Sequence, residues 1–166
     1  MNETTLFLQL ITKASKAGNR KFGTAPGFFY SCPEEFVLQN GCDFEPRRLE
    51  TKKYRYCKIG YCFYNTYRLI LKYSELNYAE GYVTMNNKHT FLHAWAMDGS
   101  SVIDNTLRWT EDRFPVSYRG IIFPRMYVIK TQMRNPNCGS LINNLENGNL
   151  LWAKEFDINS LSTDLE

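Results

Sequence analysis

The fold of this chain is decided by the stretch TFLHAWAMDGSSVID, residues 90–104. Its first eight residues are mostly apolar and predict a strand, and Asp98-Gly99 is a strong signal for a two-residue hairpin turn. Residues 101–104 are then the return strand. If Asp98 and Gly99 form the turn, the numbers of facing residues sum to 197, and His93 lies opposite Asp104.

The predicted register pairs a histidine with a carboxylate. Directly opposed residues have Cβ atoms about 4.5–5.5 Å apart on one face of a sheet. At that separation a carboxylate can accept a hydrogen bond from an imidazole N–H. Asp104 is therefore expected to orient His93.

A cysteine precedes this hairpin, at the start of a predicted helix. Apolar side chains recur at helical spacing from Phe63 to Leu71, which predicts a helix from about Cys62 to Tyr73. The unpaired N–H groups of a first helical turn stabilise a thiolate, and the Cys62 N–H can bind a developing oxyanion. A thiol becomes a nucleophile at neutral pH when a base lies beside it, and His93 is the candidate base.

Three short motifs carry a family resemblance: GYCFYN at residues 60–65, HAW at 93–95 and DNT at 104–106. Together they resemble the core of the transglutaminase-like and papain-like cysteine enzymes. The resemblance implies an α+β fold in which a nucleophile helix packs on a small antiparallel β-sheet. It also implies a catalytic triad with the nucleophile at Cys62, the base at His93 and the orienting acid at Asp104. An aspartate at this last position is nearer the transglutaminase-like pattern than the asparagine typical of papain.

The second oxyanion donor is not assigned by these motifs. Papain-like members often supply it from a glutamine upstream of the nucleophile, but no glutamine lies close before Cys62, and Tyr56 is the substitute candidate. Further candidates for contact with the oxyanion or the substrate are Tyr61, Asn65 and Trp95. Several aromatic residues are predicted either to belong to the core or to line an acyl-binding cleft: Tyr78, Tyr82, Trp95, Trp109 and Tyr118.

The rest of the chain is expected to complete a single domain over residues 1–150. Further helices are predicted at 4–17, ending before Gly18, and at 34–39, and further strands at 78–85 and 125–131. Residues 151–166 are predicted to form an acidic C-terminal tail.

Composition excludes several classes of protein. A net charge of +3, from 20 basic and 17 acidic residues, is too small for a typical nucleic-acid-binding domain. The five cysteines are an odd number without the spacing of a disulfide framework, which favours reduced thiols in the cytoplasm. Neither a signal peptide nor a membrane-spanning stretch is evident, so no membrane association is expected. No cofactor is expected, since the chain has no Gly-rich phosphate loop.

Two other interpretations of the same residues remain. Cys57, Cys62, His89 and His93 have spacings that invite a zinc site, but two histidines four residues apart on one strand would lie about 13 Å apart, too far to share one ion. The basic run 47–58, with tyrosines between its lysines and arginines, is a solvated face, a phosphate-tracking surface or a region that attracts an acidic or phosphorylated substrate.

The sequence therefore predicts a cysteine-dependent hydrolase or acyltransferase that acts on an amide or ester bond. Its substrate would be a peptide, a protein or a small amide or ester, and no metal is required. The alternative is a non-enzymatic module that binds nucleic acid or an acidic protein through residues 47–58.

Overall fold

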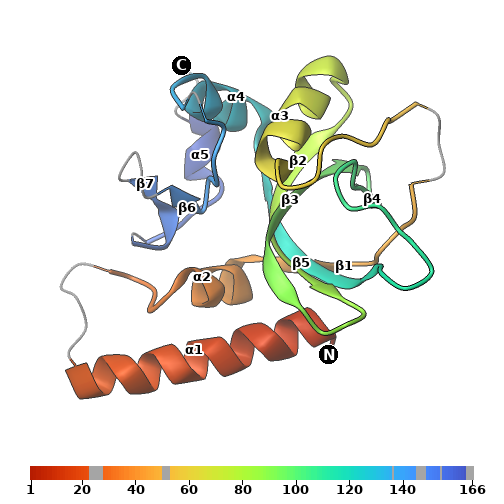
Figure 1. Ribbon diagram of the computed structural model, residues 1–166. Coiled ribbons are helices and arrows are strands. Elements are labelled where there is room, and N and C mark those ends of the chain that lie inside the picture. The colour runs from red at the N-terminus through yellow and green to blue at the C-terminus, as the bar shows by residue number, and fades with distance from the viewer. Residues whose placement is uncertain (23–27, 50–52, 136, 145–148, 154, 164–166) are drawn as a thin grey trace.

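The computed structural model describes residues 1–22, 28–49, 53–135, 137–144, 149–153 and 155–163 and shows a mixed α+β protein (Figure 1). Its elements in chain order are α1 (Glu3–Phe22), α2 (Pro33–Asn40), β1 (Cys42–Phe44), α3 (Cys62–Lys72), β2 (Asn77–Met85), β3 (Thr90–Asp98), β4 (Ser101–Ile103), β5 (Pro115–Phe123), α4 (Arg125–Met133), β6 (Asn143–Asn144), β7 (Asn149–Leu150), the 3₁₀ turn Leu151–Ala153 and α5 (Ser160–Thr163). Among the described helices, none combines the length and the apolar character needed to cross a membrane.

The centre of the fold is a curled antiparallel sheet with the strand order β1-β5-β2-β3-β4 (Figure 1). Strand β2 is its middle strand and pairs along its length with β3 and with β5. A methyl group at Gly120 of β5 would lie 2.6 Å from the carbonyl oxygen of Glu80 and 2.6 Å from Trp95 Cη2. Only glycine therefore fits here, and the space that it leaves is filled by the Trp95 ring.

The sheet is buried on both faces, and the two faces belong to two clusters. Helix α3 and the C-terminal segments cover one face, which carries Tyr78, Ala94 and Phe123. The other face carries Trp95 and Tyr118. Helices α1 and α2 lie at the opposite end of the sheet from α3 (Figure 1).

The predictions for α2, α3, β2 and β3 are confirmed to within a residue or two. The predicted first helix was too short, because α1 continues through Gly18 to Phe22. Gly18 keeps a helical backbone and nothing lies within 4 Å of the position of its missing Cβ. A glycine at such an uncrowded position only weakens a helix and does not end it.

The strand predicted at 125–131 is wrong, since these residues begin helix α4. Pro124 precedes the helix at its N-cap and Val128 is buried against the core. The sheet strand of this region is instead β5, Pro115–Phe123, which sequence reasoning missed together with β1. Strand β5 is largely buried on both faces and is interrupted by Gly120, so it lacks the alternation of polar and apolar residues that marks a half-buried strand.

The hairpin between β3 and β4 turns one residue later than predicted. Asp98 pairs with Ser101 and Ala96 pairs with Ile103, so facing numbers sum to 199 and the turn residues are Gly99 and Ser100. Gly99 has a φ of +57°, which suits the first position of a type II′ turn. Asp98 would have to adopt a less favourable backbone to take that position.

A buried carboxylate joins the sheet to the C-terminal segment. Glu80 of β2 is fully buried and accepts hydrogen bonds from the backbone N–H groups of Leu141 (2.9 Å) and Ile142 (3.1 Å). The hydroxyl groups of Tyr78 and Ser140 donate to the same carboxylate. Burial raises the pKa of Glu80, while these four donors oppose the rise.

We expect Glu80→Gln to lower the free energy of unfolding by about 1–3 kcal/mol, because each carboxylate oxygen faces one backbone N–H and an amide can supply only one oxygen. Urea denaturation at pH 7 measures this effect. Glu75→Gln is the matched control, since Glu75 is exposed and its ion pair with Lys53 contributes little. Equal stability of the two variants would contradict the role given to Glu80.

Candidate active site

Cys62 is the first residue of α3 and is partly exposed. The preceding residue, Tyr61, occupies the N-cap position without a capping side-chain hydrogen bond, and its carbonyl accepts the Asn65 N–H at 2.8 Å. The N–H groups of the first turn, including that of Cys62, have no partner within the helix. They are therefore available to an oxygen that develops negative charge beside the sulfur.

His93 lies on β3 and is almost completely buried, with 1% of its surface exposed. Its ring stacks on Trp95, with centroids 6.3 Å apart and planes 18° apart, and meets the ring of Phe91 edge-on at 5.8 Å. Its Nε2 is 2.8 Å from Oδ2 of Asp104. The Cys62 side chain lies close enough to the His93 ring to help raise the pKa of the imidazole.

Asp104 is buried, and its carboxylate has four hydrogen-bond donors. Oδ2 accepts from His93 and from the Tyr118 hydroxyl at 2.9 Å. Oδ1 accepts from the backbone N–H groups of Thr106 and Leu107, both at 2.9 Å. The carboxylate is thus held from the strand β3, the strand β5 and its own loop.

These contacts shift both titrating groups toward their charged forms. Burial by itself lowers the pKa of His93, but the charge and hydrogen bond of Asp104, together with the contact to Cys62, raise it to about 10. Burial by itself raises the pKa of Asp104, but His93 and the two loop N–H groups hold it below its ordinary value. An imidazolium on His93 is therefore strongly stabilised.

The predicted contact between His93 and Asp104 is present, although the hairpin register differs from the predicted one. Strand β4 ends at Ile103, so Asp104 has no directly opposed partner on β3. A change of two in the sum of facing numbers keeps Asp104 on the same face as His93 and Trp95. The carboxylate then reaches His93 as a diagonal neighbour.

The four predicted oxyanion or substrate residues have different surroundings. Tyr56 is half-buried; burial and the charge of nearby Asp104 raise its pKa. Tyr61 is exposed beside Cys62, with the Lys58 ammonium 4.5 Å from its ring.

Asn65 and Trp95 are buried, and both have contacts within the protein. Asn65 Nδ2 donates to the carbonyl of Lys58 (2.8 Å) and to Thr106 Oγ1 (3.0 Å). Trp95 is fully buried between His93 and Tyr118, so it supports the histidine ring from within the core and does not face a substrate.

Most of the aromatic residues proposed for an acyl-binding cleft are core residues. Tyr78, Tyr82 and Tyr118 are buried and each donates its hydroxyl to a carboxylate, while Trp109 stacks on Phe114. Trp95 contacts the triad by stacking on His93, and Tyr118 contacts it through its hydrogen bond to Asp104. The role of Tyr118 depends on the pairing of β5 with β2, a long-range contact for which the sequence holds no local signal.

The segment before α3 and the loop after β4 are hydrogen-bonded to each other. The Cys57 N–H donates to the Asn105 carbonyl at 2.7 Å, and Asn105 Nδ2 donates to Cys57 Sγ at 3.4 Å. Asn65 joins the same loop to α3 through Thr106. Cys62 and Asp104 are therefore fixed by one connected set of contacts.

The structure separates His89 from His93, the two histidines that invited a zinc site. His89 is exposed and tilted against Phe91, with centroids 5.3 Å apart, at the opposite side of Phe91 from His93 along the strand. Across the described ranges, no three His, Cys, Asp or Glu side chains are grouped to hold a metal ion.

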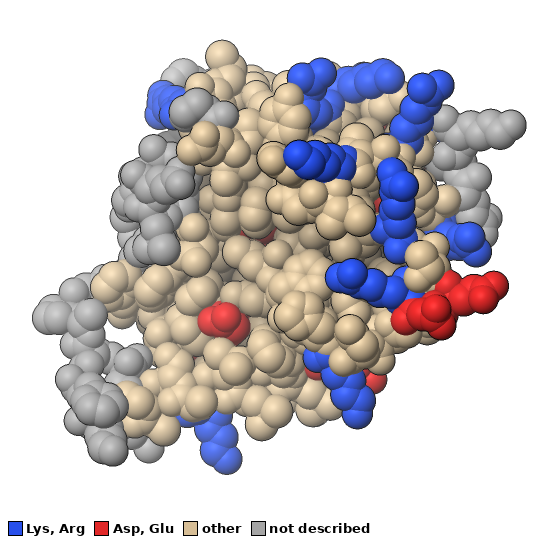
Figure 2. All heavy atoms as spheres, in the orientation of Figure 1, with Lys and Arg blue, Asp and Glu red and all other residues tan. Residues whose placement is uncertain are grey.

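The basic run 47–58 is divided between contacts and open surface. Arg47 donates to Ser101 Oγ at 2.8 Å, and Lys53 forms an ion pair with Glu75 at 2.6 Å. Figure 2 shows lysine and arginine side chains gathered over α3 and the segment that precedes it.

Comparison of the chain with protein-family models, characterised proteins and solved structures finds no significant match. The chemistry of the site is therefore inferred from its own residues and their contacts.

We expect His93 to remain an imidazolium through pH 8, since its pKa is raised to about 10. Asp104→Asn removes the carboxylate charge and leaves burial as the main influence, so the pKa of His93 should fall to its ordinary value of about 6.5 or lower. The ¹³Cε1 and ¹Hε1 chemical shifts of His93, followed by NMR against pH, measure both values. His89 is the only other histidine and identifies the second signal.

A His93 signal that titrates near pH 6.5 in the unmodified protein and does not move in Asp104→Asn would contradict the ion pair.

Proposed function

We propose that this protein is a cysteine-dependent hydrolase or acyltransferase that acts on an amide or ester bond. The observation that carries the proposal is the chain of contacts from Cys62 through His93 to Asp104, in which a partly exposed thiol lies against a buried, oriented imidazole. A buried imidazolium–carboxylate pair beside a reactive thiol is the arrangement that nucleophilic catalysis by cysteine requires.

Before the substrate is attacked, the proton of the Cys62 thiol has already passed to His93, so that a thiolate lies beside an imidazolium. Asp104 stabilises the resulting imidazolium, as the raised pKa of His93 indicates. In the first step the sulfur attacks the carbonyl carbon of the substrate, a C–S bond forms, and the electron pair of the carbonyl double bond moves to oxygen. The Cys62 N–H, unpaired within α3, is the donor that we assign to this oxyanion.

In the second step the oxyanion collapses and the bond to the leaving amine or alcohol breaks. The leaving group takes the proton from His93, and a thioester remains on Cys62. Water then attacks the thioester with His93 as base, and release of the acid restores the thiol. An amine in place of water would complete a transfer.

The order and roles of these residues are those of the transglutaminase-like and papain-like enzymes, and we propose that the chain shares their core. The packing of α3 against β3 and the position of Asp104 after the neighbouring strand support this assignment. The aspartate favours the transglutaminase-like pattern. All five cysteines are free thiols, which fits the reducing cytoplasm that we propose as its location.

The alternative function, a module that binds nucleic acid through residues 47–58, gains less support. Two of its basic side chains, Arg47 and Lys53, already have partners in the protein. It also leaves the buried pair of His93 and Asp104 without a role beyond stability. Steep weakening of oligonucleotide binding with salt would be its signature.

We expect Cys62 to be the most reactive thiol and to be acylated by an activated ester such as p-nitrophenyl acetate. Cys62→Ala should abolish the burst of p-nitrophenolate, His93→Ala should reduce its rate by about 10²–10⁴-fold, and Asp104→Asn should cause a smaller loss because aspartate only orients and stabilises the imidazole. Stopped-flow absorbance measures the burst, and mass spectrometry locates the acetyl group.

Cys42→Ala is the matched control, because Cys42 is an exposed thiol on β1, away from the triad in the sheet order. It should leave the burst unchanged. Acetylation of Cys42 or Cys57 ahead of Cys62, with a normal burst in Cys62→Ala, would show that the triad is not catalytic.

A further inference from the structure

A cavity of about 550 Å³ lies between α3 and the segment that precedes it. The helix contributes its face from Asn65 to Lys72, and residues 53–57 form the opposite wall. The volume is within the range of sites for small ligands, about 300–1,000 Å³.

The wall of this cavity is basic. Four of its ten lining residues are lysine or arginine and none is acidic: Lys53, Arg55, Arg68 and Lys72 are the basic ones. Lys53 is paired with Glu75. Within the described residues, no carboxylate lies in ion-pairing distance of Arg55, Arg68 or Lys72 (salt bridges occur only at other positions).

Two residues that line the cavity lie close in sequence to members of the triad. Asn65 lines it one helical turn after Cys62, and Asn105, the neighbour of Asp104, lines it from the other side. The cavity therefore lies between the helix that begins with Cys62 and the loop that carries Asp104.

We propose that this cavity binds an anionic group, a carboxylate or a phosphate, carried by a small acyl substrate of Cys62. Arg55, Arg68 and Lys72 supply the positive charge, and the acyl carbon then lies toward Cys62. The assignment of the ligand as a substrate rests on the proposed function, whereas the binding of an anion does not.

A native thiol inside the cavity permits a direct test. Cys57 lines the cavity, is partly exposed and lies among these basic residues. In full-length Cys62→Ser protein, its rate of modification is measured with two methanethiosulfonate reagents of similar size, one with an anionic sulfonate and one with a cationic ammonium group. The ratio of the two rates cancels differences in the ionisation of the thiol itself.

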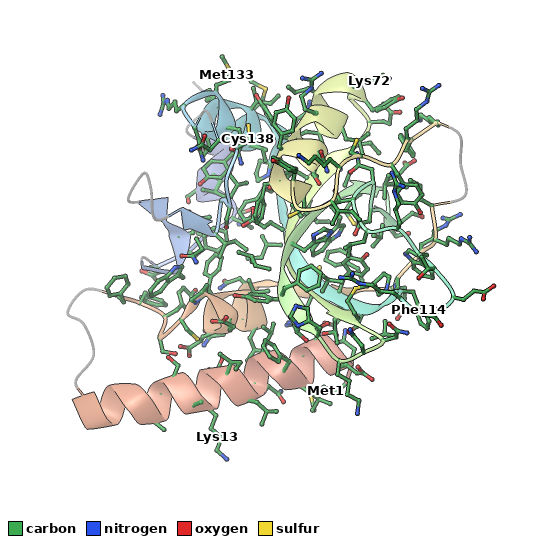
Figure 3. All side chains as sticks on the ribbon, viewed as in Figure 1. Met1, Lys13, Lys72, Phe114, Met133 and Cys138 are labelled. Carbon is green, nitrogen blue, oxygen red and sulfur yellow. The ribbon has the colours of Figure 1, made fainter. Side chains whose placement is uncertain are left out.

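We expect the anionic reagent to modify Cys57 faster than the cationic one, with a ratio on the order of tenfold above that of free glutathione. Arg55→Gln, Arg68→Gln and Lys72→Gln should each reduce the ratio several-fold. Lys13→Gln is the matched control, because it removes the same charge from α1, at the far end of the molecule from Lys72 (Figure 3). High salt should reduce the ratio as well.

Inorganic phosphate and glutarate, added at constant ionic strength, distinguish the two anion chemistries by the protection that each gives to Cys57. Protection by either one supports the proposal and identifies the preferred group. Equal rates for the two reagents, or a ratio that Lys13→Gln lowers as much as Arg68→Gln does, would overturn it. Protection by a single-stranded oligonucleotide but by neither small anion would also overturn it, in favour of a nucleic-acid surface.

Because these rates are measured without Cys62, they are independent of the burst reaction. A normal burst with no charge preference at Cys57 would support the catalytic triad and refute the anion site. A clear charge preference at Cys57 with no burst would support the anion site and refute the catalytic triad.

Discussion

The buried carboxylate of Asp104 is the interaction on which the rest of this site depends. Its four donors come from β3, from β5 and from its own loop, so one side chain joins three parts of the chain. Leaving this buried charge without a partner would cost about 3–5 kcal/mol of stability, so the fold favours conformations that keep the donors in place. The same carboxylate stabilises an imidazolium on His93. Stability of the fold and readiness for proton transfer therefore have one physical origin.

The sheet supplies the rigid support for that pair. Trp95 packs under the His93 ring and occupies the space above Gly120, where any side chain would meet its ring or the backbone of β2. Tyr118, on β5 across the middle strand β2, packs edge-on against Trp95 and donates to Asp104. The histidine ring is thus oriented by packing against Trp95 and by its hydrogen bond to Asp104.

Helix α3 and the loop after β4 both line the basic cavity and carry residues of the triad. The hydrogen bonds between Cys57 and Asn105 and between Asn65 and Thr106 hold the segment before α3 against the loop after β4. These contacts position Cys62, and three of the four residues that make them line the cavity. A ligand held among Arg55, Arg68 and Lys72 would therefore lie against the elements that carry the reacting groups.

The sequence by itself determined the local elements and the residue types of the site. Helical spacing after Cys62 and the hairpin signal at Asp98-Gly99 are short-range patterns, and they sufficed to predict α3, β2 and β3 and to place His93 and Asp104 on one face. The predicted position of the hairpin turn was wrong by one residue. The sum of facing residue numbers therefore changes by two, which leaves the same side chains on each face of the sheet. Only the tertiary structure decided that β5 completes the sheet, that Tyr118 and two loop N–H groups satisfy Asp104, and that basic side chains from two segments enclose one cavity. These features depend on contacts between residues far apart in the chain, and such contacts leave no periodic trace in the local sequence.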